Sequence, residues 1–218
     1  MALISNNTQT QSQSSETDLS LVIALDVSYS VDVAEYDLMR IGLASALDTD
    51  AVEKALLTGL HGAIQICVVQ WSGFQEQAIK IEWTLVRNRA ELSALASRIR
   101  TIARRYRGGA TDISGALQYC RELIQSAPDQ NSRQVIDLVA DGTNNVNFPP
   151  GFERDITVAA GITINGLAIT NDVSDLVDYF ISNIIGGPGA FVEAAAEYTD
   201  FELAMRRKLV REMQSYVS

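Results

Sequence analysis

The sequence predicts a doubly wound α/β domain with a mostly parallel six-stranded sheet, helices on both faces and one short antiparallel strand at an edge. Apolar runs that suit strands covered on both faces alternate with segments whose apolar residues recur every three or four positions. Strands that alternate with helices form βαβ crossovers, and these produce parallel sheets. The length of 218 residues fits one such domain better than two small ones.

The predicted elements follow one another from residue 19 to residue 214. Continuous apolar runs predict four buried parallel strands, over residues 19–26, 63–71, 134–141 and 162–169. An alternating run at 77–84 suits an edge strand with solvent nearby, and the alanine-rich run at 190–196 predicts the last strand. Apolar spacings of three and four predict helices over residues 33–47, 89–102, 113–126, 175–184 and 201–214.

The first residues differ in composition from the rest of the chain. Residues 1–17 are rich in Ser, Thr, Gln and Asn and show no apolar periodicity, so we expect a flexible tail followed by a folded domain over residues 18–218. No signal peptide is recognisable, and no apolar run approaches the roughly 20 residues that span a bilayer. The sequence as written therefore predicts a soluble cytoplasmic chain with no membrane partner. Native export stays open, because a polar leader can replace a removed segment.

The charge of the chain argues against a nucleic-acid partner. Seventeen Lys and Arg residues stand against 27 Asp and Glu, and the resulting formal net charge of −10 repels a phosphate backbone. The basic residues gather in two segments: Arg98, Arg100, Arg104, Arg105 and Arg107, then Arg206, Arg207, Lys208 and Arg211. We interpret them as a solvent-exposed helix face and the end of a helix, with an anion site as the alternative.

Polar residues gather in three loops at the edge where open α/β sheets bind ligands. Asp26 ends the first strand and leads to Ser28 and Ser30, Thr111 precedes a helix, and Asp141 ends the fourth strand. Their carboxylate and hydroxyl oxygens suit a hard cation and leave positions for water, as Mg²⁺ or Mn²⁺ prefers, whereas zinc lacks its usual Cys or His ligands. An ion held by two carboxylates and three hydroxyls stays partly unneutralised and attracts an anionic group.

This constellation, Asp-x-Ser-x-Ser with a separate Thr and a later Asp-Gly, resembles the metal-ion-dependent adhesion site of von Willebrand factor A domains. The segments ALDVSYS, VVQWSG, DGTNN and IIGGPGAFVEAA are similar to a functionally uncharacterised bacterial branch of that family, and the likeness spans residues 19 to about 217. It implies a Rossmann-like sheet of order 3-2-1-4-5-6. It also implies that Ser28, Ser30 and Thr111 contact the metal directly, while Asp26 and Asp141 act directly or through water.

Other residues with chemical potential have simpler interpretations. His61 has no carboxylate or serine partner at a readable spacing, which favours a structural role over catalysis. The glycines around Pro188 are not followed by the Lys-Ser/Thr of a phosphate-binding loop, so they indicate a turn with positive φ. Cys67 and Cys120 fall in apolar stretches and are expected to be buried, reduced thiols.

Two features beside the predicted metal ligands stay open. Asn144, Asn145 and Asn147 either line the rim and bind a ligand or only shape their loop. Tyr29, between the two serines, either flanks a ligand or packs against the protein.

Three classes of function are compatible with the predicted site. The first, which we favour, is a binding module in which the carboxylate of a protein or a small acid completes the coordination of Mg²⁺. The second is a metal-dependent hydrolase or phosphotransferase that uses Asp26, but a phospho-accepting aspartate normally has a second acid two residues on and a lysine nearby. The third is a domain whose ion only stabilises the fold. The ligand and the oligomeric state do not follow from the sequence.

Overall fold

A central six-stranded sheet with the order β3-β2-β1-β4-β5-β6 organises the domain. The computed structural model describes residues 16–214. The strands are β1 (Leu19–Asp26), β2 (Ile64–Trp71), β3 (Gln77–Val86), β4 (Arg133–Ala140), β5 (Thr163–Ile169) and β6 (Val192–Ala195). β3 runs antiparallel to β2 at one edge, and the other neighbours pair in parallel. The predicted fold class is therefore confirmed, including the direction of the edge strand, although β3 has ten residues.

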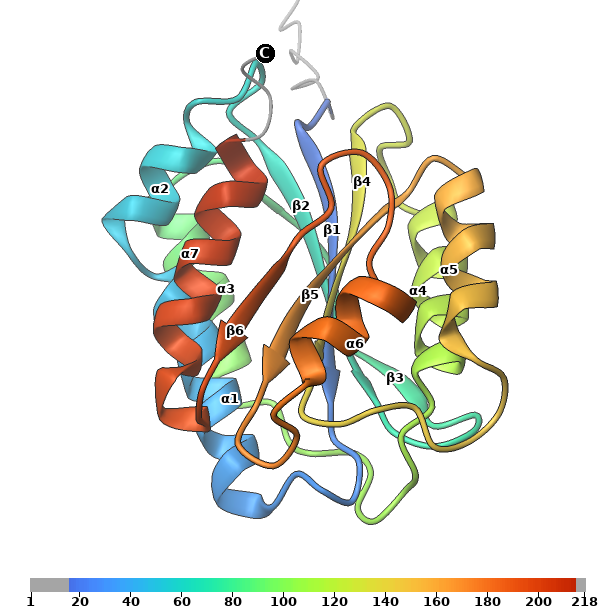
Figure 1. Cartoon of the computed structure of the whole chain (residues 1–218). Helices are drawn as coiled ribbons and strands as arrows, with labels where there is room; N and C mark the ends of the chain where they lie inside the picture. The colour runs from blue at the N-terminus through green and yellow to red at the C-terminus, as the bar shows by residue number, and fades with distance from the viewer. Residues whose placement is uncertain (1–15, 215–218) are drawn as a thin grey trace, which may run out of the picture.

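The helices cover both faces of this sheet, as predicted (Figure 1). They are α1 (Val33–Leu47), α2 (Asp50–Leu56), α3 (Arg89–Ile99), α4 (Ile113–Gln125), α5 (Pro150–Ala159), α6 (Leu176–Asn183) and α7 (Phe201–Gln214), with a short 3₁₀ helix, η1 (Tyr198–Asp200), before α7. α2 and α5 were not predicted. α3 ends at Ile99, three residues before the predicted end at residue 102, so the segment that carries Arg104, Arg105 and Arg107 is not helical.

The hydrophobic core has two halves, one on each face of the sheet. Side chains of α1, α2, α3 and α7 build the first half, and those of α4 and α6, with the edge of α5, build the second. β1 serves both halves, because successive strand residues point to opposite faces. Leu21, Ile23 and Leu25 join the first half, and Val22 and Ala24 join the second. Burial on both faces explains why the sequence of β1 is a continuous apolar run.

The folded contacts begin close to the predicted domain boundary at residue 18. Residues 1–15, which make up most of the predicted tail, lie outside the described residues. Thr17 is buried, and its backbone N–H donates to Asp129 Oδ2 at 2.7 Å, so the contacts start one residue before that boundary. Within residues 16–214, no helix has both the length and the apolar character needed to cross a membrane.

Candidate metal-binding site

The carboxyl ends of the parallel strands open at one edge of the sheet, at the lower end of the molecule in Figure 1. β1 and β4 are neighbours in this sheet, with Leu25 paired to Val139. Asp26 is the last residue of β1, and Asp141 directly follows β4. The strand order therefore brings two carboxylates together from distant parts of the chain.

Hydrogen bonds hold the loop after β1 in place. Asp26 Oδ1 accepts a hydrogen bond of 2.7 Å from the backbone N–H of Ser28. The backbone N–H of Tyr29 donates to the carbonyl of Gly109 at 2.9 Å, which ties this loop to the segment before α4. Because Ser28 and Ser30 are two positions apart, both hydroxyls lie on the same side of the loop, with their oxygens 3.2 Å apart.

The five predicted ligands meet in one cluster. Ser30 Oγ donates to Asp141 Oδ1 at 2.7 Å, and Thr111 Oγ1 donates to Ser28 Oγ at 3.3 Å. Asp26 joins the cluster through its bond to the Ser28 backbone. Ser30 is exposed, whereas the other four residues are buried, so the cluster meets solvent on the Ser30 side.

Asp26 is the least satisfied polar group of this cluster. Its Oδ2 is buried and has no hydrogen-bond partner among the described residues. Burial, followed by the nearby charge of Asp141, raises the pKa of Asp26 from 3.8 to about 8, although the Ser28 hydrogen bonds and Arg104 act in the opposite direction. A cation bound beside Asp26 and Asp141 would offset the repulsion between the two carboxylates.

The asparagines after Asp141 hold the Thr111 segment in place. Asn145 Oδ1 accepts from the backbone N–H of Thr111 at 2.9 Å, and the Asn145 N–H donates to the Thr111 carbonyl at 3.1 Å. Asn144 Oδ1 accepts from the N–H of Ile113, and Asn147 Nδ2 donates to Asp112 at 3.2 Å. These contacts favour the loop-shaping interpretation of the asparagines. Tyr29, in contrast, is 81% exposed and lies at the rim.

Arg104 supports the loop through hydrogen bonds to its backbone, a role that the sequence did not reveal. Its Nη2 donates to the carbonyls of Val27 and Ser28, both at 2.9 Å, and its Nη1 donates to the carbonyl of Asp32 at 3.2 Å. The interpretation of Arg104 as part of an exposed helix face was wrong, because the helix ends at Ile99 and the side chain turns inward. A planar guanidinium can bridge several carbonyls in this way.

Tyr198 is a second residue whose role the sequence did not reveal. It lies in η1, and its buried phenol donates to Asp141 Oδ2 at 2.9 Å. Burial and the charge of Asp141 raise the pKa of Tyr198, so it remains a neutral donor. Asp141 is thus bound on one oxygen by Ser30 and on the other by Tyr198. The only signal in the sequence for this role of Tyr198 was its position just after the predicted last strand.

The chemistry of the donors limits which ion this cluster suits. The described residues contain no group of three or more His, Cys, Asp or Glu side chains arranged to hold a metal. A site here must therefore use hydroxyls together with the two carboxylates. Oxygen donors of this kind, with room for water on the exposed side, fit a hard divalent cation.

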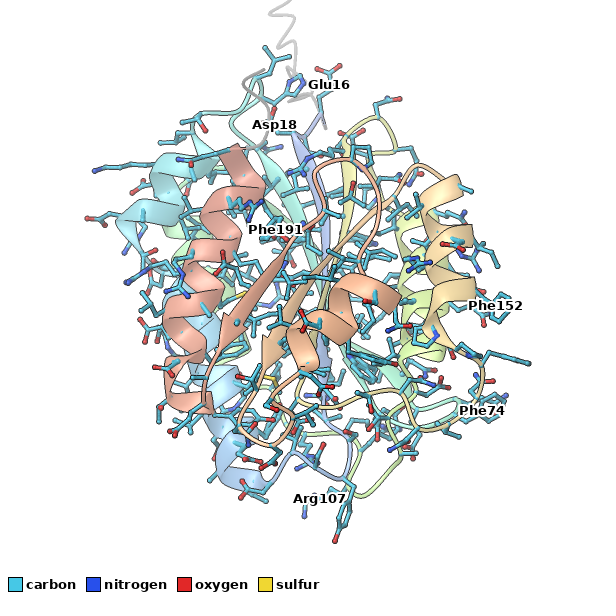
Figure 2. The ribbon with its side chains drawn as sticks, in the orientation of Figure 1. Glu16, Asp18, Phe74, Arg107, Phe152 and Phe191 are labelled. Atoms are coloured by element: carbon cyan, nitrogen blue, oxygen red, sulfur yellow. The ribbon has the colours of Figure 1, made fainter. Side chains whose placement is uncertain are left out.

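The remaining residues singled out from the sequence lie elsewhere. His61 Nδ1 is 3.8 Å from Glu16 Oε2, and Figure 2 shows Glu16 at the end of the molecule opposite to Arg107. Gly187 and Gly189 have φ of 94° and 68°, so the predicted turn with positive φ is confirmed. The two cysteines are buried free thiols, as expected.

Solved structures with the same fold define the class of this domain. Proximal thread matrix protein 1 from the mussel byssus is 17% identical with a TM-score of 0.67, over 89% of this chain and 47% of that chain. A von Willebrand factor type A protein from Catenulispora acidiphila is 15% identical with a TM-score of 0.61, over 90% and 43%. The chain thus spans about half the length of these proteins. The fold is that of a von Willebrand factor A domain.

The family of the chain follows from its sequence. Residues 16–217 match the family described as "Protein of unknown function (DUF1194)", and the chain belongs to this family. No curated protein matches the chain. BatB, a conserved hypothetical protein from Bacteroides thetaiotaomicron, shares the fold over 90% of this chain and 99% of its own, with 13% identity and a TM-score of 0.58.

Proposed function

We propose that this domain is a metal-dependent binding module that holds one Mg²⁺, or Mn²⁺, with Asp26, Ser28, Ser30, Thr111 and Asp141. The observation that supports it best is that hydrogen bonds link these five residues into one cluster, in which the buried Asp26 Oδ2 has no partner among the described residues. A small, hard cation is the group that such an oxygen set accommodates.

The bound ion would act as the contact point for a partner. Three of its protein ligands are neutral hydroxyls, and where a carboxylate acts through water the ion keeps part of its charge, with an outward coordination position on the Ser30 side. A carboxylate from a protein or a small acid would complete the coordination. One structure of the mussel protein, 18% identical to this chain, is described as having a zinc-occupied MIDAS (metal-ion-dependent adhesion site) motif, which supports a divalent ion in this fold.

The same geometry makes hydrolysis a weaker proposal. His61 is the only histidine, and it lies before β2, at the amino end of the strands, whereas Asp26 lies at the carboxyl end of β1. A general base must reach the reacting group within hydrogen-bond distance, directly or through one water. We therefore propose that the chain is not itself an enzyme. Metal-dependent turnover of phosphate or acyl esters that disappears in Asp26→Asn would contradict this.

Isothermal titration calorimetry with Mg²⁺ and Mn²⁺ tests the metal site. We expect one ion per chain for the wild type and no measurable binding for Ser28→Ala or Asp141→Ala. Ser114→Ala is the matched control, because Ser114 is also a buried serine but donates to Asp112 outside the cluster. Circular dichroism of each variant checks that the fold is retained. Unchanged affinity in both site variants would place the ion elsewhere.

A pull-down from the source cells tests the contact with a partner. We expect capture in Mg²⁺ and release by chelator, and loss of capture when the partner's contacting Asp or Glu is changed to Ala. Capture that survives both treatments would show that the cation is not the contact.

A further inference from the structure

A groove of about 310 Å³ runs beside the candidate metal site, between α1 and the segment 101–107. Three arginines and one aspartate contribute its charged side chains: Arg40, Arg104, Arg107 and Asp37. Three positive charges against one negative charge leave the lining with a net positive charge, although the whole chain carries −10. The groove is therefore a local exception to the acidic character of the molecule.

The arginines of this groove differ in how far they are already engaged. Arg104 is bound to backbone carbonyls, and Arg40 Nη2 pairs with Asp37 Oδ1 at 2.7 Å. Arg107 is exposed, and it forms no ion pair within residues 16–214. Arg105, two positions before it, is exposed as well. Among the lining residues, the positive charge without an ion-pair or backbone partner is therefore that of Arg107.

That end lies against the loop that carries the predicted metal ligands. Gly109, two residues after Arg107, accepts a hydrogen bond from the backbone N–H of Tyr29. Arg104 lines the groove and also donates to the carbonyl of Ser28. Figure 2 shows Arg107 at the lower end of the molecule, where the strands end. The groove and the candidate site therefore form one continuous surface.

From this continuity we infer that the partner is an acidic protein segment that binds at two points. One carboxylate binds the cation, and a second acidic side chain of the same segment binds Arg107 in the groove. This inference rests on the proposed function.

Nuclear magnetic resonance titration of the full chain with a hexaglutamate peptide tests both contacts separately. In Mg²⁺ we expect shifts of the backbone amides of the Ser28 to Ser30 loop and of the Arg107 Nε–Hε signal. Arg107→Ala should weaken binding about two- to fivefold, as for one partly exposed ion pair, and should reduce its salt dependence. Arg98→Ala is the matched control, because Arg98 is exposed at the end of α3 and does not line the groove.

The possible outcomes separate this inference from the proposed function. Shifts in the loop alone, with equal affinity for the wild type and Arg107→Ala, would overturn the groove contact and leave metal-dependent binding intact. Shifts at Arg107 alone, unchanged by chelator, would contradict the two-point contact and the proposed role of the metal. No shift at either place would overturn this inference, and the proposed function is then judged separately by the calorimetric titration with Mg²⁺. Tighter binding of a sulphated oligosaccharide than of hexaglutamate would overturn the assignment of a protein segment.

Discussion

The phenol of Tyr198 donates a hydrogen bond of 2.9 Å to Asp141 Oδ2, so a residue from η1 holds a carboxylate at the end of β4. The other oxygen of Asp141 accepts from Ser30 at 2.7 Å. With both oxygens engaged, the carboxylate has a defined orientation before any ion arrives. Groups that orient a metal ligand in this way commonly affect metal affinity as strongly as some ligands do.

Tyr198→Phe should therefore lower the affinity for Mg²⁺ by about tenfold while the domain stays folded. The change removes one hydroxyl and keeps the buried ring. Tyr36→Phe is the matched control, because that buried phenol donates to the carbonyl of Ile102 and does not touch the cluster. Calorimetric titration of both variants measures the difference. Equal affinities would show that the orientation of Asp141 does not depend on Tyr198.

Arg104→Lys should weaken metal binding even though the positive charge is retained. A single ammonium group cannot reproduce the fork that reaches the carbonyls of Val27, Ser28 and Asp32, so the loop loses part of its support. We expect a loss of about 1 to 3 kcal/mol in the free energy of unfolding, together with weaker metal binding. Denaturant titration and calorimetry measure the two effects. Arg105→Lys, at an exposed position, should change neither.

A buried ionic group lies between β4 and α7. Lys208 Nζ lies 2.8 Å from Asp137 Oδ1 and 2.7 Å from Glu212 Oε1, and all three side chains are fully buried. Burial raises the pKa of Asp137 from 3.8 to about 7, with Glu212 adding to the effect and Lys208 opposing it. As the pH rises, the folded chain therefore keeps the proton on Asp137 up to a higher pH than the unfolded chain does.

Because the folded-state pKa lies above the unfolded one, Asp137 favours folding at low pH, and this contribution is lost as the pH rises from about 4 to about 7. Asp137→Asn cannot titrate. Relative to this variant, the wild type should lose roughly 2 to 4 kcal/mol of unfolding free energy over that range. Denaturant titrations at several pH values measure the difference. Asp155→Asn, on the exposed side of α5, should follow the wild-type curve.

The parts of the fold that the sequence predicted are those where periodicity is strong. Burial on both faces makes the sequences of β1 and β2 mostly apolar. α2 has only seven residues, too few to establish a period. In α5, Phe152 and Ile156 are exposed, so its apolar residues do not mark a buried face. A pattern that depends on burial cannot reveal such a helix.

The candidate site likewise contains residues that the sequence indicated and residues that it did not. Asp26, Ser28, Ser30, Thr111 and Asp141 could be proposed because they form a motif in loops next to predicted strands and helices. Tyr198 and Arg104 act through single contacts that only the folded chain creates, to Asp141 and to backbone carbonyls. The spacing of residues in the sequence does not show which backbone carbonyls the Arg104 guanidinium will contact.

The candidate metal site lies at the edge of the sheet rather than in the hydrophobic core. The candidate ligands lie in loops at the edge of the sheet, while the core is packed on both faces without them. We therefore expect the chain to stay folded in chelator and to gain stability from Mg²⁺ only through binding. At an Mg²⁺ concentration of about 100 times Kd, that gain is about 2.7 kcal/mol.

For a domain of this size, such a gain corresponds to a rise in Tm of roughly 5 to 10 °C. Thermal unfolding in chelator and in increasing Mg²⁺ measures it, and Ser28→Ala should show no rise because it lacks a ligand. Far-ultraviolet circular dichroism in chelator separates the two roles of the ion. A chain that loses its helical signal when the metal is removed would show a structural ion, since binding to a folded site leaves the apo fold in place.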